Sequence, residues 1–537
     1  MYKLWSILAV FMIVTVPLCA APSEAVRLFN EGEDHYTKGE IDDAIASFTK
    51  AIERAPDYAQ AYFGRGMALT DQQKYDQALT DYSKAIELKP EFLDAYAYRG
   101  MVNKTLGKNA QAINDYTKVI ALKPEKLDAY FYRGMTYLNL NELELATADF
   151  SKAIELQPDN PDAYAYRGMA YKQAGKNAEA VADYSKMIEL KADSADAYTY
   201  RGMAYEKLGK MDLATADYSK AIDLKPEMVD AYLFRGMAYF RTPGKADNAV
   251  ADYTKVLAIK PDAVDAYLFR AMANEKLGKY DQALADYSKL IELKPDNLTA
   301  ITYRAMVYRQ LGKYDKAVED YTKIITLKPD AAEIYTYRGI AYETLGQYSL
   351  AVTDYSKAIE LKADNTDAYM LRAMASYKNS GNTDQAIADY TKVINIKPTS
   401  ADAYLYRGIA YENAEKMDKA IADYSRAIEC NPNLADAYAF RAMAYYRDLE
   451  KYDLAIADYT KVIVLKPDSA DAYFNRAMAF RQQNKIDQCI ADFTKAIALR
   501  ADYADAYFYR GKAYESQAKY DLAVSDITKA RQLRTQK

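Results

Sequence analysis

The residues best suited to chemistry in this sequence are arginines that recur every 34 or 35 residues, each followed by an aspartate in the same stretch. The first such pair is Arg65 with Asp81, and the last is Arg510 with Asp526. A guanidinium can meet a carboxylate with two parallel hydrogen bonds. We therefore predict a structural Arg–Asp pair in each stretch, and not a phosphate site. The arginines are Arg65, Arg99, Arg133, Arg167, Arg201, Arg235, Arg270, Arg304, Arg338, Arg372, Arg407, Arg441, Arg476 and Arg510.

Signals of catalysis or metal binding are sparse. His35 is the only histidine, so no Ser–His–Asp set and no histidine-rich metal spacing recurs. Paired carboxylates occur in every stretch, whereas a catalytic dyad should be singular. The sequence therefore predicts a protein that is not an enzyme, with no catalytic residue, no metal and no cofactor.

Charge and cysteine usage narrow the class of protein further. The 537 residues include 71 basic and 76 acidic side chains, a formal net charge of -5. Both signs are interleaved along the chain, so no basic stripe indicates a nucleic-acid partner. Cys430 and Cys489 stand where an apolar or small residue is usual, which favours two separate buried thiols over a disulfide.

The first residues have the pattern of an export signal. Lys3 precedes an apolar run from Leu4 to Val16, and Pro17 and small residues follow it. The run is short for a membrane span and fits cleavage after Ala20 or Ala21. We predict a signal peptide over residues 1–21 and an exported protein that is periplasmic, extracellular or envelope-associated. The alternative is an uncleaved segment that anchors the N-terminus to a membrane.

The remainder, residues 25–537, consists of fifteen tandem repeats of 34 or 35 residues, each with two helical patterns. In the repeat from Ala195 the helices are expected over about Asp196–Leu208 and Met211–Leu224, with a break at Gly209. Three repeats are one residue longer, and we expect the extra residue in the loop between the helices. The repeats begin at Ala25, Ala59, Leu93, Leu127, Pro161, Ala195, Val229, Val264, Leu298, Ala332, Thr366, Ala401, Ala435, Ala470 and Ala504.

This pattern resembles the tetratricopeptide repeat, a helix-turn-helix of 34 residues. In the repeat from Ala195 the matching residues are Tyr198, Gly202, Ala214, Tyr218 and Pro226. The resemblance covers nearly all of the chain after residue 25. It implies an all-α fold, a right-handed superhelical solenoid of stacked antiparallel helix pairs, in which the first helix of each pair lines a concave groove.

A strip of aromatic and methionine side chains recurs on the first helix of each pair, and the resemblance places it in the groove. Such a strip either packs neighbouring helices together or also offers contact area to a ligand. An extended peptide or an amphipathic helix suits it, and a glycan is the alternative. The candidate binding residues are Tyr166, Met169, Tyr200, Met203, Phe234, Met237, Phe269, Met272, Tyr303 and Met306.

These observations favour a non-catalytic, exported scaffold that binds protein or peptide segments in the groove. The alternative is an envelope-associated module that handles a glycan or a secreted polymer. A membrane contact is expected only through an uncleaved signal segment. Ile527 and Leu533 keep the last helix partly apolar, so weak self-association through that end of the array is a further alternative.

Overall fold

The computed structural model describes residues 23–447 and 450–535, and within these residues every regular element is a helix. The predicted signal segment lies outside the described residues. The thirty helices are α1 Ser23–Lys38, α2 Ile41–Arg54, α3 Ala59–Asp71, α4 Tyr75–Leu88, α5 Leu93–Thr105, α6 Asn109–Leu122, α7 Leu127–Asn139, α8 Leu143–Leu156, α9 Pro161–Gln173, α10 Asn177–Leu190, α11 Ala195–Lys207, α12 Met211–Leu224, α13 Val229–Arg241, α14 Ala246–Ile259, α15 Val264–Lys276, α16 Tyr280–Leu293, α17 Leu298–Gln310, α18 Tyr314–Leu327, α19 Ala332–Thr344, α20 Tyr348–Leu361, α21 Thr366–Ser380, α22 Thr383–Ile396, α23 Ala401–Asn413, α24 Met417–Cys430, α25 Ala435–Arg447, α26 Tyr452–Leu465, α27 Ala470–Gln482, α28 Ile486–Leu499, α29 Ala504–Ser516 and α30 Tyr520–Thr535.

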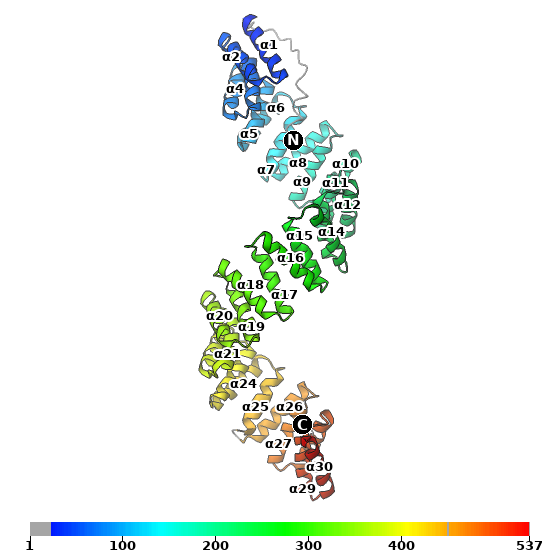
Figure 1. The fold of residues 1–537 in the computed structure, drawn as a ribbon, viewed down its shortest axis with the longest axis vertical. Helices are drawn as coiled ribbons and strands as arrows, with labels where there is room; N and C mark the ends of the chain where they lie inside the picture. Colours follow the sequence, from blue (N-terminus) through cyan, green and yellow to red (C-terminus); the bar gives the residue numbers. More distant parts are fainter. Residues whose placement is uncertain (1–22, 448–449, 536–537) are drawn as a thin grey trace. The chain divides into compact units, whose positions relative to one another are not determined.

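Each repeat contains one pair of these helices, the odd-numbered helix A and the even-numbered helix B. Within each of the two parts described next, the two helices of a pair pack on each other, and each helix B also packs on the next helix A. By its contacts the chain divides into two parts, one ending at Leu277 and the other beginning at Gly278. Figure 1 shows the successive pairs along each part. The predicted all-α solenoid of stacked helix pairs is confirmed.

The repeat from Ala195 shows why these residues form two short helices. The hydroxyl of Ser194 accepts a hydrogen bond from the amide of Ala197 and so caps α11, which satisfies one otherwise unpaired amide. Gly209 ends the turn after α11 with φ +72°, a left-handed conformation that glycine adopts at little cost. Lys225 follows the last residue of α12, and Pro226 comes next. Proline lacks a backbone N–H, so the helix does not continue past this point.

Within each part, the core lies between the helices of a pair and between neighbouring pairs. In α12 the side chains of Ala214, Tyr218 and Ala221 are fully buried. Opposite them, a Cβ atom on Gly202 would lie 2.7 Å from the Tyr218 ring. The ring therefore packs directly on the backbone of α11, and this close approach accounts for the aromatic and the glycine that recur together along the chain.

The extra residues of the longer repeats do not all have the expected place. In the repeat from Val229 the insertion lies in the loop Thr242–Lys245, as predicted. In the repeat from Thr366 the prediction is wrong, because α21 has 15 residues where α13 has 13. The added turn at Asn379 and Ser380 is exposed, so the helix lengthens there without disturbing a packed surface.

Both described cysteines are free thiols. Cys489 is fully buried, and desolvation raises its pKa to about 12, so the expectation of a buried thiol is confirmed there. Cys430 is only half-buried, since it lies at the last residue of α24. Within residues 23–447 and 450–535, no helix combines the length and the apolar character that crossing a membrane requires.

Some repeats place a residue with a side chain at the turn position that glycine holds elsewhere. Ala518, between α29 and α30, has φ +57° and is exposed. A Cβ atom at such a φ costs roughly 1–2 kcal/mol relative to an unstrained backbone. Strain of this kind is absent at Gly209, whose φ is similar.

We expect Ala518→Gly to raise the free energy of local opening of α29 and α30 by about 1 kcal/mol, because it removes the strain at the turn. Amide hydrogen exchange of the two helices measures this free energy. Gly209→Ala is the matched control and should lower the corresponding value for α11 and α12 by a similar amount. Faster exchange in the Ala518→Gly protein would contradict the prediction.

Candidate functional site

The recurring arginine makes a two-pronged ion pair inside its own repeat. In α11, Arg201 donates from Nε to Oδ2 of Asp217 and from Nη2 to Oδ1 of the same carboxylate, both at 2.8 Å. The Asp217 side chain on α12 is 9% exposed and that of Arg201 is 20% exposed. The hydrogen bond to Asp217 raises the pKa of Arg201 above its usual value. The predicted pair is therefore present and largely withdrawn from water.

The same guanidinium also reaches the preceding repeat. Arg201 donates from Nη1 to the hydroxyl of Ser185 on α10 at 3.1 Å. Ser185 in turn donates to the carbonyl of Val181 at 2.7 Å, which leaves its oxygen to accept from the arginine. One side chain thus joins three helices. This hydroxyl was not predicted from the sequence, although a Ser or Thr stands sixteen residues before each of these arginines.

Two tyrosines on the same helix lie against the guanidinium. The centres of the Tyr198 and Tyr205 rings are 5.6 Å and 5.8 Å from the guanidinium carbon of Arg201. Tyr198 precedes the arginine by one helical turn and Tyr205 follows it by one. An aromatic face attracts a cation and excludes water from it, so the rings support the ion pair as well as the core.

We call the arginine, its aspartate and the preceding hydroxyl the arginine link. It recurs as Arg65–Asp81–Thr49, Arg99–Asp115–Ser83, Arg133–Asp149–Thr117, Arg167–Asp183–Ser151, Arg201–Asp217–Ser185, Arg235–Asp252–Ser219, Arg304–Asp320–Ser288, Arg338–Asp354–Thr322, Arg372–Asp389–Ser356, Arg407–Asp423–Thr391, Arg441–Asp458–Ser425, Arg476–Asp492–Thr460 and Arg510–Asp526–Thr494. The prediction of an Arg–Asp pair is confirmed in each of these repeats.

We call the predicted binding residues the A-helix strip; eight of them lie in the part that ends at Leu277, and Tyr303 and Met306 lie in the part that begins at Gly278. Its ten members are Tyr166, Met169, Tyr200, Met203, Phe234, Met237, Phe269, Met272, Tyr303 and Met306. Nine are half-buried, and Met169 is 39% exposed. Each strip residue therefore contacts its neighbours and also keeps part of its surface toward solvent.

Each strip aromatic rests on the buried aromatic of the preceding helix B. The Tyr200 ring centre is 5.7 Å from that of Tyr184, and the Phe234 ring is 6.0 Å from Tyr218 and parallel to it within 27°. The pairs Phe150–Tyr166, Tyr253–Phe269 and Tyr287–Tyr303 are spaced alike, at 5.8 to 6.0 Å. The packing role is thus real for the rings, and their role in binding stays a prediction.

Charges differ from repeat to repeat beside the strip. In α11, Glu206 accepts a hydrogen bond from the hydroxyl of Tyr218 at 3.2 Å and pairs with Arg241 of the next helix A. The corresponding residue of α9 is Lys172, whose Nζ lies 3.7 Å from Sδ of Met203. Burial lowers the pKa of Lys172, and the charge of Lys207 lowers it further.

The lysine in place of the glutamate leaves a polar atom unsatisfied. The hydroxyl of Tyr184, the equivalent of Tyr218, is buried and has no hydrogen-bond partner. A buried donor of this kind costs about 1–3 kcal/mol. The strip therefore has a uniform apolar character but a variable electrostatic border.

One group of side chains with metal-binding atoms was not predicted. Ligand atoms of His35, Glu40 and Asp43 lie within 4.8 Å of one another near the start of the chain. Nδ1 of His35 and Oε2 of Glu40 share a hydrogen bond of 2.5 Å. This contact between exposed groups accounts for their closeness. The signal in the sequence was the lone histidine with acidic residues five and eight positions later.

Comparison with known families decides the class of the repeat. Models described as tetratricopeptide repeat match residues 29–91, 93–126, 127–160, 150–182, 195–228, 229–263, 264–297, 332–365 and 401–434. A model described as TPR repeat matches residues 168–209, 305–346, 375–415, 444–480 and 477–517. The chain belongs to the tetratricopeptide repeat family. The resemblance seen in Tyr198, Gly202, Ala214, Tyr218 and Pro226 is thereby confirmed.

Several solved structures are similar to stretches of this tetratricopeptide chain. YrrB, described as a TPR protein with an unusual peptide-binding site, is 27% identical with a TM-score of 0.32, over 34% of this chain and 95% of YrrB. Yeast Tom70 is 21% identical with a TM-score of 0.33, over 83% and 99%. A tetratricopeptide repeat protein from Parabacteroides merdae is 21% identical with a TM-score of 0.35, over 47% and 98%. These TM-scores are low, so family membership rests on the family models. No curated protein sequence matches the chain.

The two partners of one arginine link should contribute to stability non-additively, so that replacing both costs less than the sum of the two single replacements. We expect Arg201→Leu to lower the local stability of α11 and α12 by about 3 kcal/mol, because it strands the buried carboxylate of Asp217. Asp217→Ala should act similarly by stranding the guanidinium. The double variant should lose markedly less than the two single losses together. Amide hydrogen exchange of α11 and α12 gives each value, and additive losses would refute the coupling.

The hydroxyl of Ser185 should contribute to the junction between successive repeats. We expect Ser185→Ala to lower the stability of the α10–α11 junction by about 1 kcal/mol, because Arg201 loses one acceptor. Ser185→Thr is the matched control and should change little, since Thr117 accepts from Arg133 at 2.9 Å in an equivalent link. Hydrogen exchange of α10 and α11 measures both. Equal exchange in the two variants would show that the hydroxyl adds nothing.

Proposed function

We propose that this tetratricopeptide protein is a non-catalytic, exported scaffold whose A-helix strip binds segments of other proteins. The observation that carries the proposal is the state of the strip residues: their rings rest on a buried ring, yet part of each remains exposed. A ring held in this way loses little conformational freedom on binding, which favours affinity. Stacked repeats of this kind commonly present extended binding surfaces.

The partner best suited to the strip is an extended or helical polypeptide with apolar side chains. Methionines such as Met203 adapt their shape to different apolar side chains, while the rings supply fixed contact area. Lys172 and Glu206 border the strip with opposite charges, so the charge pattern of the segment should influence where it binds. Export rests on the pattern of residues 1–21, and a glycan ligand remains the alternative from the sequence.

We expect a protein carrying Met203→Glu, Met237→Glu and Met272→Glu to lose its partner, because three charges would face apolar side chains of the ligand. The wild-type and variant proteins would be used to capture partners from the envelope and secreted fraction of the source organism. Peptide and glycan arrays would then identify the ligand class. Circular dichroism should first show equal helical content.

The matched control carries the same charges elsewhere. Leu145, Leu213 and Ile259 lie on B helices and are 49%, 47% and 42% exposed. Their triple replacement by Glu adds three equal charges and should leave capture unchanged. Equal capture by wild-type protein and by the methionine variant would mean that the strip serves packing alone. Binding to the glycan array and not to the peptide array would favour the alternative ligand.

A further inference from the structure

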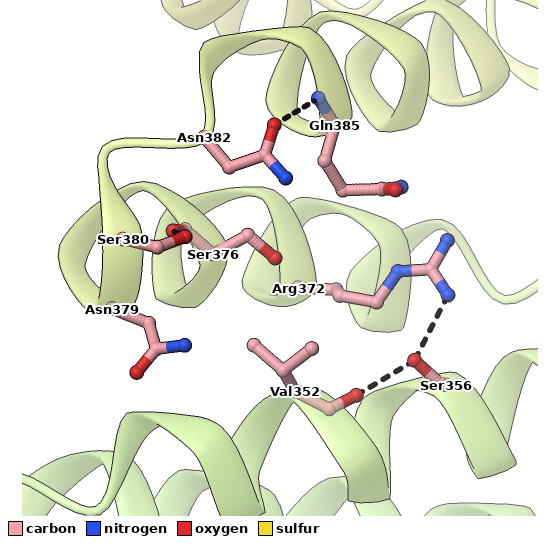
Figure 2. A pocket seen from close by; sticks show the side chains of 8 residues that line it. All are labelled: Val352, Ser356, Arg372, Ser376, Asn379, Ser380, Asn382 and Gln385. Atoms are coloured by element: carbon pink, nitrogen blue, oxygen red, sulfur yellow. Dashed lines mark hydrogen bonds between the residues drawn. The ribbon is translucent and has the colours of Figure 1, made fainter.

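A small pocket of about 210 Å³ opens within the C-terminal part, beside the arginine link of the repeat from Thr366. Figure 2 shows its lining, which comes from three successive helices, α20, α21 and α22, and from the turn before α22. Arg372 and Ser376 on α21 lie along it, with Ser356 of α20 and Gln385 of α22. The lining is mostly polar and belongs neither to the A-helix strip nor to its charged border.

The pocket lies where neighbouring repeats place a tyrosine ring. Ser376 follows Arg372 by one helical turn, as Tyr342 follows Arg338 and Tyr411 follows Arg407. In both neighbours the ring centre lies 5.7 Å from the guanidinium carbon. Serine cannot supply this ring, and its own side chain is buried at 5% exposure.

Two other repeats that lack the ring fill the space with a different side chain. Leu69 takes the position in the repeat from Ala59 and is 5% exposed. Asn103 takes it in the repeat from Leu93, where its amide donates to Asp115 at 3.1 Å. Ser376 is smaller than either. The longer α21 places Asn379 and Ser380 at the rim of the pocket and does not close it.

The chemistry of Arg372 favours a flat neutral ring over an anion. Its Nε and Nη2 donate to Asp389 at 2.9 and 2.6 Å, and Nη1 donates to Ser356 at 3.0 Å. Asp389 is 1% exposed and compensates the positive charge. These hydrogen bonds lie in the guanidinium plane, so the face toward Ser376 is the part available for contact. The ring of Tyr369, one helical turn before Arg372, already has its centre 5.7 Å from the guanidinium carbon.

We propose that this pocket binds the phenol side chain of a tyrosine supplied by a bound polypeptide, which takes the place that Tyr342 and Tyr411 take in the neighbouring repeats. The ring stacks on the guanidinium of Arg372, an arrangement that aromatic groups and arginine favour. The volume suffices, because a cavity of about 150 Å³ already holds benzene. The amides of Asn379 and Asn382 at the rim suit the phenol hydroxyl.

The first test uses p-cresol, the isolated side chain of tyrosine, with the full-length protein. Saturation-transfer NMR on the ligand should show binding that Ser376→Tyr weakens by about tenfold or more, because the chain's own ring fills the pocket. If the Ser376→Tyr protein does not fold, Ser376→Leu fills the pocket instead, as Leu69 does in the repeat from Ala59. Ser376→Ala keeps the pocket open and should bind as the wild type does. Equal binding by wild type and both filled variants would overturn the proposal.

The second test asks whether the aromatic face of the ligand is required and whether a ring attached to a polypeptide backbone can enter the pocket. 4-Methylcyclohexanol, which has no aromatic face, should bind roughly fivefold more weakly than p-cresol. N-acetyl-tyrosinamide should compete with p-cresol, because a polypeptide must deliver the ring while attached to a backbone. Competition by 4-methylcyclohexanol as strong as by p-cresol would exclude stacking on Arg372. Binding of p-cresol without competition by N-acetyl-tyrosinamide would overturn the assignment to a polypeptide.

The pocket is separate from the A-helix strip, and p-cresol binding to the strip variant tests this separation. The protein with Met203→Glu, Met237→Glu and Met272→Glu should bind p-cresol as the wild type does. A loss of binding in that variant would contradict a separate site. A negative result in partner capture therefore does not bear on the proposal for the pocket. A negative result in p-cresol binding likewise does not bear on the proposal for the strip.

Discussion

The stacking of repeats in this protein depends on one recurring contact, the arginine link. Arg201 holds Asp217 inside its own repeat and Ser185 of the preceding one. The stability of a repeat array is the sum of terms within repeats and terms between neighbours, and this side chain contributes to both. A buried ion pair adds little net stability compared with apolar packing. Its hydrogen bonds have fixed directions, however, so it defines how one repeat is placed on the next.

The arginine link also determines which side chains of helix A remain available for contact with a ligand. Tyr198 and Tyr205 lie against the arginine on one side of α11. Tyr200 and Met203 occupy the other side, where Tyr200 rests on the buried ring of Tyr184. Helix α11 is thus apolar on both sides for different reasons. One side closes the core, and the other is partly covered and partly open to solvent.

Much of this arrangement could be predicted from the sequence because it repeats. The spacing of Arg201 and Asp217 indicated an ion pair, and the breaks at Gly209 and Pro226 predicted the helix ends to within one residue. The hydroxyl of Ser185 was missed because Ser and Thr are common on exposed helix faces, and only the geometry shows that an arginine reaches it. The predicted place of the extra residue in the repeat from Thr366 was wrong, because the end of α21 can lengthen where packing does not limit it.

The pocket at Ser376 shows where periodicity stops being informative. Leu69, Asn103, Asn274 and Ser376 all replace the aromatic ring at this position, and the sequence treats these four replacements alike. The volume and hydrogen bonds of each side chain decide the outcome: leucine fills the space, asparagine fills it and donates to Asp115, and serine leaves a cavity. A periodic surface does not define where a ligand lies along it, because a shift by one repeat restores similar contacts. A position that differs in one repeat removes that equivalence, since the repeats on either side place the rings of Tyr342 and Tyr411 there.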